Sequence, residues 1–325
     1  MSAAPHGILL VDKAADRTSH DVVARVRWLL GTKKVGHAGT LDPMATGLLV
    51  LGIGQGTRLL THFVGLDKTY TATIRLGAAT TTDDREGEAL GEIRDARGIS
   101  EARVEEALTS LRGDIQQVPS TVSAIKIDGR RAYARARAGE DVTLAARPVR
   151  VTRFEITGRR ESGPHVDLDA VVTCSSGTYV RALARDLGEA LSVGGHLTAL
   201  RRTRVGPFDV ADALHVPARG EGDDVDLPLR GLGATAAQVL PVVPVDDEAA
   251  RALADGKRIP RAPAAARTEA MPEEPSTWRP ELVDDAPEES LHAARDPQGR
   301  LCAILRAEGE DLWRPTLVVP AADRS

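Results

Sequence analysis

The sequence predicts an α+β fold in which strands and helices follow one another along the chain, with a smaller β-rich unit at the C-terminus. Three observations predict it. Residues 68–76 alternate apolar and polar side chains, residues 19–30 place apolar side chains at helical spacing, and short apolar runs between turns recur after residue 240. With 325 residues, 42% of them hydrophobic, the chain can form one large domain and a smaller one.

The first elements are a strand, a helix and a second strand. Gly7 to Asp12 is a short apolar run that predicts a buried strand. Ser19 then precedes apolar residues at positions 22, 23, 26, 29 and 30 and a glycine at position 31, which predicts a capped amphipathic helix. Residues 48–53 predict another buried strand.

A half-buried strand follows at Lys68 to Leu76, where Tyr70 shares the apolar face with positions 72, 74 and 76. Residues 78–98 are polar and contain glycines, which indicates a loop and a hairpin. Ser100 starts a helix, and strands are expected at 149–157 and 166–174.

A further helix is expected from about Thr178, with Arg181 in its first turn. A cation is electrostatically disfavoured at a helix N-terminus. We therefore expect a carboxylate to pair with Arg181, and we predict that it is Asp42.

The C-terminal part starts with a change of composition. A linker rich in Gly, Asp and Pro precedes a helix at 248–255 and short strands at 291–294, 301–306 and 317–319, with a turn at 297–299. Residues 260–289 are dense in Pro, Ala and Glu and are expected to be a disordered insertion.

The most informative segment for function is GHAGTLDPMATG, residues 36–47, which places Asp42 among three glycines. Glycine permits tight turns and close approach to a ligand. An Asp followed by a Pro is also the pattern of a helix N-cap with Pro at the first helical position. Local chemistry thus leaves two interpretations of Asp42, a helix cap and a reactive carboxylate.

Residues 34–58, KVGHAGTLDPMATGLLVLGIGQGTR, closely resemble the signature of the bacterial tRNA pseudouridine synthase B (TruB) family. Further blocks resemble the family in the same order: GILLVDK from Gly7, DKTY from Asp67, the run from Val118 to Lys126, and CSSGTYVR from Cys174. One departure is Val122, where many members have an aromatic residue.

The resemblance implies a pseudouridine synthase fold, with a mixed, largely antiparallel central sheet flanked by helices. It also implies three regions: a catalytic domain at 1–216, a linker at 217–239, and a PUA-like RNA-binding domain at 240–325. The implied activity is isomerisation of uridine-55 in the T arm of tRNA by base flipping, cleavage of the glycosidic bond and reattachment through C5.

The resemblance also implies roles for individual residues. Asp42 is the catalytic carboxylate, as a nucleophile or as a base at the sugar; Tyr70 stacks on the target base, and Arg181 keeps Asp42 ionised. His37 is expected to contact RNA. Four weaker candidates remain. Asp84 is expected to support Arg181, and Lys13 and Lys68 to contact phosphate or to be structural. Leu200 is expected to be a pocket wall or a core residue.

The charge distribution favours an RNA partner although the net charge is −5. Residues 1–210 hold 29 basic and 25 acidic side chains, whereas residues 211–325 hold 13 and 22. Residues 125–160 carry ten basic and four acidic side chains, and such a basic stripe can neutralise phosphates. A solvated arginine-rich face is the alternative. The RNA-contact candidates here are Lys126, Arg130 and Arg131.

The reaction needs no electron carrier, and we expect no cofactor and no metal, since nucleotide-binding and metal-ligand motifs are absent from the sequence. Cys174 and Cys302 are expected to be buried small hydrophobes. We expect a cytoplasmic monomer with tRNA as partner and no membrane association. Alternative functions are a guide-RNA-dependent pseudouridine synthase, a noncatalytic RNA chaperone and, remotely, a metal-dependent hydrolase.

Overall fold

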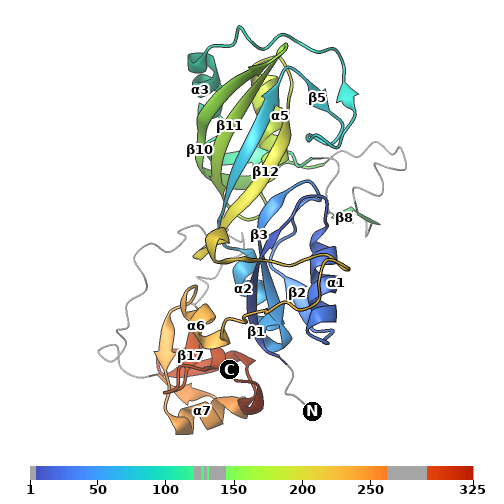
Figure 1. The fold of residues 1–325 in the computed structure, drawn as a ribbon. Coiled ribbons are helices and arrows are strands. Elements are labelled where there is room, and N and C mark those ends of the chain that lie inside the picture. Colours follow the sequence, from blue (N-terminus) through green and yellow to red (C-terminus); the bar gives the residue numbers. More distant parts are fainter. Residues whose placement is uncertain (1–4, 121–125, 128–129, 132–143, 262–290, 325) are drawn as a thin grey trace. The chain divides into compact units, whose positions relative to one another are not determined.

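The computed structural model describes residues 5–120, 126–127, 130–131, 144–261 and 291–324. The chain divides into two compact units (Figure 1). Unit 1 contains residues 1–42, 47–66 and 205–325, and unit 2 contains residues 43–46 and 67–204. Asp42 is therefore the last residue of the first segment of unit 1.

The N-terminal part of unit 1 is a small sheet with a helix beside it. Strand β1 (Gly7–Lys13) pairs antiparallel with β3 (Thr46–Ile53), and β3 pairs antiparallel with β2 (Val35–His37). On the other side of β1 lies the parallel strand β14 (Leu214–His215). Both predicted buried strands are confirmed, since nearly every side chain in β1 and β3 is buried.

Helix α1 (Ser19–Leu29) packs its apolar face, Val22, Val23 and Val26, into a core with residues of β1 and β3. The predicted helix is confirmed, but its predicted cap is wrong. Thr18 is the N-cap and forms a capping box with Asp21, whereas Ser19 is the first helical residue. The Ser19 hydroxyl is therefore not used for capping the helix.

The region predicted to be a linker lies against α1. Just before this region, the Val216 carbonyl accepts a hydrogen bond from the Arg17 guanidinium at 2.7 Å. The buried Arg25 side chain donates to the Pro217 carbonyl at 3.0 Å and forms an ion pair with Asp223 at 2.7 Å. Side chains of α1 and the segment before it therefore fix the start of this region.

The C-terminal part of unit 1 is a five-stranded sheet with two helices. The strand order is β15 (Val242–Pro244), β17 (His292–Arg295), β18 (Leu301–Glu308), β19 (Leu312–Val318) and β16 (Ile259–Pro260). The helices are α6 (Leu232–Ala237) and α7 (Asp247–Ala254). The helix predicted near residue 248 and the three predicted strands are confirmed; the predicted insertion lies almost wholly outside the described residues.

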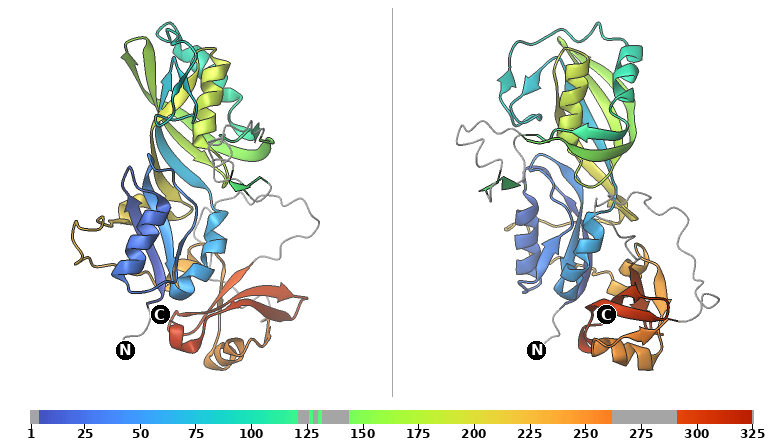
Figure 2. Two further views of the ribbon diagram at one scale, coloured as in Figure 1. Left: turned by 90° about the vertical axis from the view of Figure 1, so that its right-hand side faces the viewer. Right: turned by 180° about the vertical axis from the view of Figure 1, so that it is seen from behind.

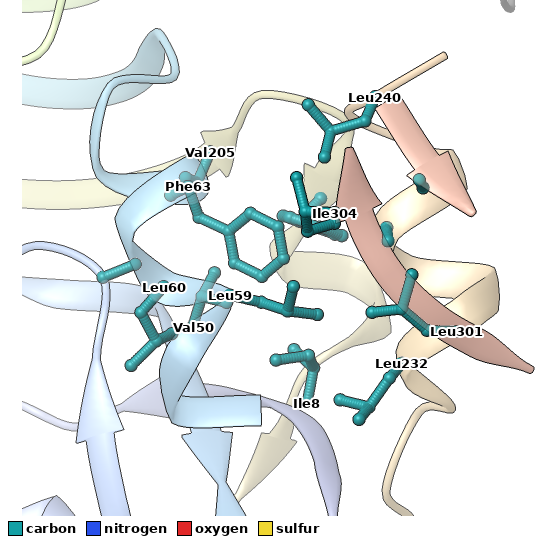
Figure 3. Packing of buried hydrophobic residues seen from close by; sticks show 14 of the residues in the cluster. Ile8, Val50, Leu59, Leu60, Phe63, Val205, Leu232, Leu240, Leu301 and Ile304 are labelled. Atoms are coloured by element: carbon teal, nitrogen blue, oxygen red, sulfur yellow. The ribbon is translucent and has the colours of Figure 1, made fainter. Parts of the chain in front are cut away.

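A single apolar cluster joins β1, β3 and α2 (Leu60–Val64) to the C-terminal sheet and α6 (Figure 3). The Phe63 ring lies near Ile304 in this cluster and meets the Phe208 ring edge-on, with 5.4 Å between ring centroids. Phe208 belongs to the short strand β13 (Phe208–Asp209). Contact through a shared core is the reason that these segments form one unit.

Unit 2 is an antiparallel sheet with helices on one face. Its strand order is β12 (Gly195–Val205), β4 (Lys68–Leu76), β11 (His165–Cys174), β10 (Arg147–Ser162) and β7 (Gly113–Gln117). Helix α5 (Val180–Ala190) packs on β4, and α3 (Glu101–Thr109) packs beside α5 (Figure 2).

The predicted elements of unit 2 are confirmed. Alternate side chains of β4 are buried, as the period of two requires, and Ser100 is the N-cap of α3. The predicted hairpin in the polar loop is β5 (Ala79–Thr80) with β6 (Ala89–Leu90). Both cysteines are buried, and burial raises the pKa of the Cys174 thiol to about 12, so this thiol stays protonated.

Candidate active site

Asp42 lies in the loop that connects β2 to β3. The Ala38 N–H donates to the Val50 carbonyl at 2.9 Å, which extends the pairing of the two strands to the start of the loop. Gly39 and Gly47 have φ values of 96° and 100°, which only glycine adopts without strain. Leu41, Met44 and Ala45 are buried, whereas Asp42 is half-buried. The loop therefore buries its apolar side chains and leaves the carboxylate partly accessible.

The interpretation of Asp42 and Pro43 as the start of a helix is wrong. The residues after Asp42 form a turn at Pro43 and Met44, and strand β3 begins at Thr46. β3 pairs with β1 from Gly47 to Ile53, so a strand and not a helix follows this turn. Asp42 thus caps no helix.

Ser19 holds the residue that precedes Asp42. The Leu41 N–H donates to Ser19 Oγ at 2.9 Å, and the Ser19 hydroxyl donates to the Leu41 carbonyl at 3.2 Å. Ser19 is fully buried and Leu41 is 4% exposed. One side chain of α1 therefore pairs with both backbone groups of Leu41.

His37 is the last residue of β2 and is half-buried. Its ring meets the ring of His20 edge-on, with 5.8 Å between centroids. His20 is the second residue of α1 and is exposed. The start of α1 thus contacts the end of β2 through His20 and the middle of the following loop through Ser19.

Arg181 is in the first turn of α5 and is 4% exposed. Its guanidinium donates to the Thr82 carbonyl at 2.8 Å and lies 3.3 Å from a carboxylate oxygen of Asp84. Asp84 is 2% exposed, and its other carboxylate oxygen accepts hydrogen bonds from the Thr82 hydroxyl and the Glu86 N–H. Asp84 is therefore a carboxylate partner of Arg181. The expected pair between Arg181 and Asp42 joins the two units and stays a prediction.

Gln117 orients the start of α5, a role that no motif around this residue indicates. Tyr179 is the N-cap of α5 and provides no side-chain cap. The fully buried Gln117 amide accepts from the Tyr179 N–H at 2.8 Å and donates to the Tyr179 carbonyl at 3.1 Å. The Arg147 guanidinium lies over the Tyr179 ring, 4.9 Å from its centroid.

Tyr70 and Lys68 lie on the buried face of β4 and are 8% and 6% exposed. Burial, and then the positive charge of Arg202, lower the pKa of Lys68 to about 8. Arg202 is 1% exposed. The burial of Lys68 favours a structural role over phosphate contact. Leu200 of β12 is also buried.

Lys13, at the end of β1, is 1% exposed, and its ammonium group donates to the carbonyls of Ala14 and Arg17 at 3.0 and 2.7 Å. These bonds fix the turn before α1, where Asp16 has a positive φ of 60°. The geometry therefore favours a structural role for Lys13 as well.

The basic stripe contains arginines whose charge is already paired. Three exposed arginines of β10 contact carboxylates: Arg150 with Asp114, Arg153 with Glu155, and Arg160 with Asp169. Lys126 and Arg130–Arg131 belong to a two-stranded hairpin, in which Lys126 pairs with Arg131. Arg135 and Arg137 of the stripe, and Val122, lie outside the described residues.

Among the described residues no group of three or more His, Cys, Asp and Glu side chains could hold a metal ion. In the same part of the chain, no helix has the length and apolar character needed to cross a membrane.

Comparison with known proteins decides the family. A model of the TruB family pseudouridylate synthase N-terminal domain matches residues 27–180, and one of the tRNA pseudouridylate synthase B C-terminal domain matches residues 181–217. A protein named tRNA pseudouridine synthase B from Corynebacterium aurimucosum is 50% identical over 94% of both chains. The chain belongs to the TruB family. Another TruB relative, from Arthrobacter sp., is 48% identical over 96% of both chains.

Solved structures share the fold. A chain from an H/ACA RNP bound to a substrate RNA containing 2'-deoxyuridine matches with a TM-score of 0.64, at 21% identity, over 98% of this chain and 86% of that one. A chain from a Cbf5-Nop10-Gar1 complex matches with a TM-score of 0.65, at 22% identity, over 97% and 85%. The predicted pseudouridine synthase fold of this TruB family member, with a β-rich C-terminal part, is thereby confirmed.

Proposed function

We propose that this protein isomerises uridine-55 in the T arm of tRNA to pseudouridine without a guide RNA. Identity near 50% over almost the whole chain to proteins named tRNA pseudouridine synthase B supports the substrate. The observation that carries the proposal for the site is the placement of Asp42, which is half-buried on a shaped loop and caps no helix.

The reaction breaks the bond between N1 of uracil and C1′ of ribose and forms a bond between C5 and C1′. The proton on C5 is lost and N1 gains one, so no electrons are exchanged with a cofactor. Asp42 acts at the sugar, and both a nucleophilic role and a role as base accord with its accessibility.

The roles proposed for the other site residues follow from the resemblance of their motifs to the TruB family. Arg181, fixed by Thr82 and Asp84, is the cation for Asp42. Tyr70 stacks on the flipped uracil. We favour this role over proton transfer, because a phenol with the ordinary pKa near 10 is a poor base. His37 contacts RNA next to the flipped nucleotide.

The RNA offsets the cost of flipping through contacts along the tRNA arm. Flipping costs a few kcal/mol. The hairpin with Lys126, Arg130 and Arg131 and the PUA-like part at 240–325 supply phosphate and shape contacts. We propose a catalytic domain at 1–216, a linker at 217–239, and action as a cytoplasmic monomer that needs neither cofactor nor metal.

Product mapping with purified protein tests this function. The substrates are an unmodified tRNA transcript and a bare T-arm hairpin, and a hairpin with cytidine at the target position is the control. We expect conversion of the one uridine in both substrates without any added RNA or protein. Conversion only when a guide RNA is supplied would establish the guide-dependent alternative. Binding without conversion under either condition would favour the noncatalytic one.

A further inference from the structure

The start of α1 contains a buried hydroxyl that is not used for capping. Thr18 provides the N-cap: its side chain accepts from the Asp21 N–H at 3.1 Å, and its own N–H donates to the Asp21 carboxylate at 2.8 Å. Ser19, one residue later, directs both of its hydrogen bonds to Leu41, which is 22 residues away. The hydroxyl therefore connects the helix to the loop that carries Asp42.

This pair of bonds restrains the backbone immediately before Asp42. Leu41 is 4% exposed and Ser19 is fully buried, so water cannot easily replace the hydroxyl at either backbone group. Fixing both the N–H and the carbonyl of one residue restricts its rotation, and the peptide that leads into Asp42 takes its orientation from that carbonyl. The position of the Asp42 carboxylate is then tied to a regular helix rather than to the loop alone.

We propose that Ser19 is a positioning residue for Asp42, acting through the backbone of Leu41. The inference rests on the proposed function, because it concerns the same carboxylate. A displacement of about 1 Å in a reacting group can lower a rate about 100-fold. Ser19→Ala should therefore lower the rate of the chemical step by about 10- to 100-fold, while the dissociation constant for tRNA changes by less than about twofold.

Thr18→Ala is the matched control. It removes the exposed helix cap next to Ser19 in the sequence and should lower the melting temperature, since loss of a cap destabilises a helix. The hydrogen bonds described for Thr18 go to Asp21 of the same helix, so the rate of the chemical step should change little. If the role of Ser19 is purely structural, both variants should have a lower melting temperature. At temperatures below melting, both should then isomerise tRNA at the wild-type rate.

The experiment compares wild type, Ser19→Ala and Thr18→Ala in single-turnover isomerisation of tRNA transcript, at saturating enzyme and well below each melting temperature. Binding is measured separately by filter retention of the same RNA. A rate loss confined to Ser19→Ala, with binding retained, supports the proposal. Equal rates in Ser19→Ala and Thr18→Ala would overturn it, and so would a loss in Ser19→Ala that appears only as weaker binding. Absence of turnover in wild type would instead refute the proposed function, so the two failures are distinguishable.

Discussion

Replacement of Asp84 by Asn tests whether Arg181 depends on a buried ion pair. The guanidinium and the carboxylate lie 3.3 Å apart, and their side chains are only 5% and 3% exposed. Breaking a buried pair by neutralising one partner costs about 3–5 kcal/mol, because the remaining charge stays desolvated. An Asn keeps the shape and an oxygen for the bonds from Thr82 and Glu86. We therefore expect the lower end of that range, about 3 kcal/mol.

Urea unfolding followed by far-UV circular dichroism measures this change as a shift in midpoint at unchanged slope. The matched control is Asp95→Asn, whose carboxylate pairs with Arg97 at the surface, where both side chains are more than half exposed. Its midpoint should stay within error of wild type. If Asp84→Asn unfolds at the same urea concentration as Asp95→Asn, then the buried pair does not hold Arg181 in place and the reasoning fails.

The remaining predictions concern a buried lysine, a helix start and the basic hairpin. The pKa of Lys68 is about 8 in the folded protein, against an ordinary value of 10.5, so between these pH values the unfolded chain binds more protons than the folded one. The free energy of unfolding should therefore rise by up to ~3 kcal/mol as the pH increases from 8 to 10.5. Lys68→Met should flatten this rise when unfolding is measured across that pH range. In Gln117→Glu an ionised carboxylate cannot donate to the Tyr179 carbonyl, so the variant should be less stable by about 1–3 kcal/mol in thermal unfolding. The exposed neighbour Gln116→Glu should not lose stability. A triple alanine variant of the hairpin replaces Lys126, Arg130 and Arg131. The plot of the logarithm of the tRNA binding constant against the logarithm of the salt concentration should become shallower by about 2 in slope. Filter binding across salt concentrations would detect this change. The control variant has alanine at Arg150, Arg153 and Arg160, which are already paired with carboxylates, and its slope should change less.

Local patterns in the sequence predicted the elements that depend on local physics. The alternation from Lys68 to Leu76 predicts which side chains of β4 are buried, and the helix expected to start at Ser100 is present, with Ser100 as its N-cap. The same reasoning failed for Ser19, because Ser and Thr are both good caps and Thr18 forms the capping box with Asp21. It also failed for Asp42 and Pro43, which lie in the loop and turn before β3 and start no helix.

The supports of the candidate site could not be predicted from sequence spacing. Gln117 bonds to Tyr179 across 62 residues, and Ser19 bonds to Leu41 across 22. Such bonds depend on which elements the fold brings together, and a single Gln or Ser has no pattern that indicates its partner. Asp42, Tyr70 and Arg181 were instead proposed through the resemblance of their surrounding motifs, and their catalytic roles stay predictions.

The most direct test of the proposed chemistry compares wild type with Asp42→Asn on unmodified tRNA transcript, with isomerisation measured at each uridine and RNA binding measured in parallel. We predict that the variant binds tRNA and forms no pseudouridine at position 55, because the amide can act neither as nucleophile nor as base at the sugar. Turnover by Asp42→Asn at the wild-type rate would contradict the assignment of the catalytic carboxylate.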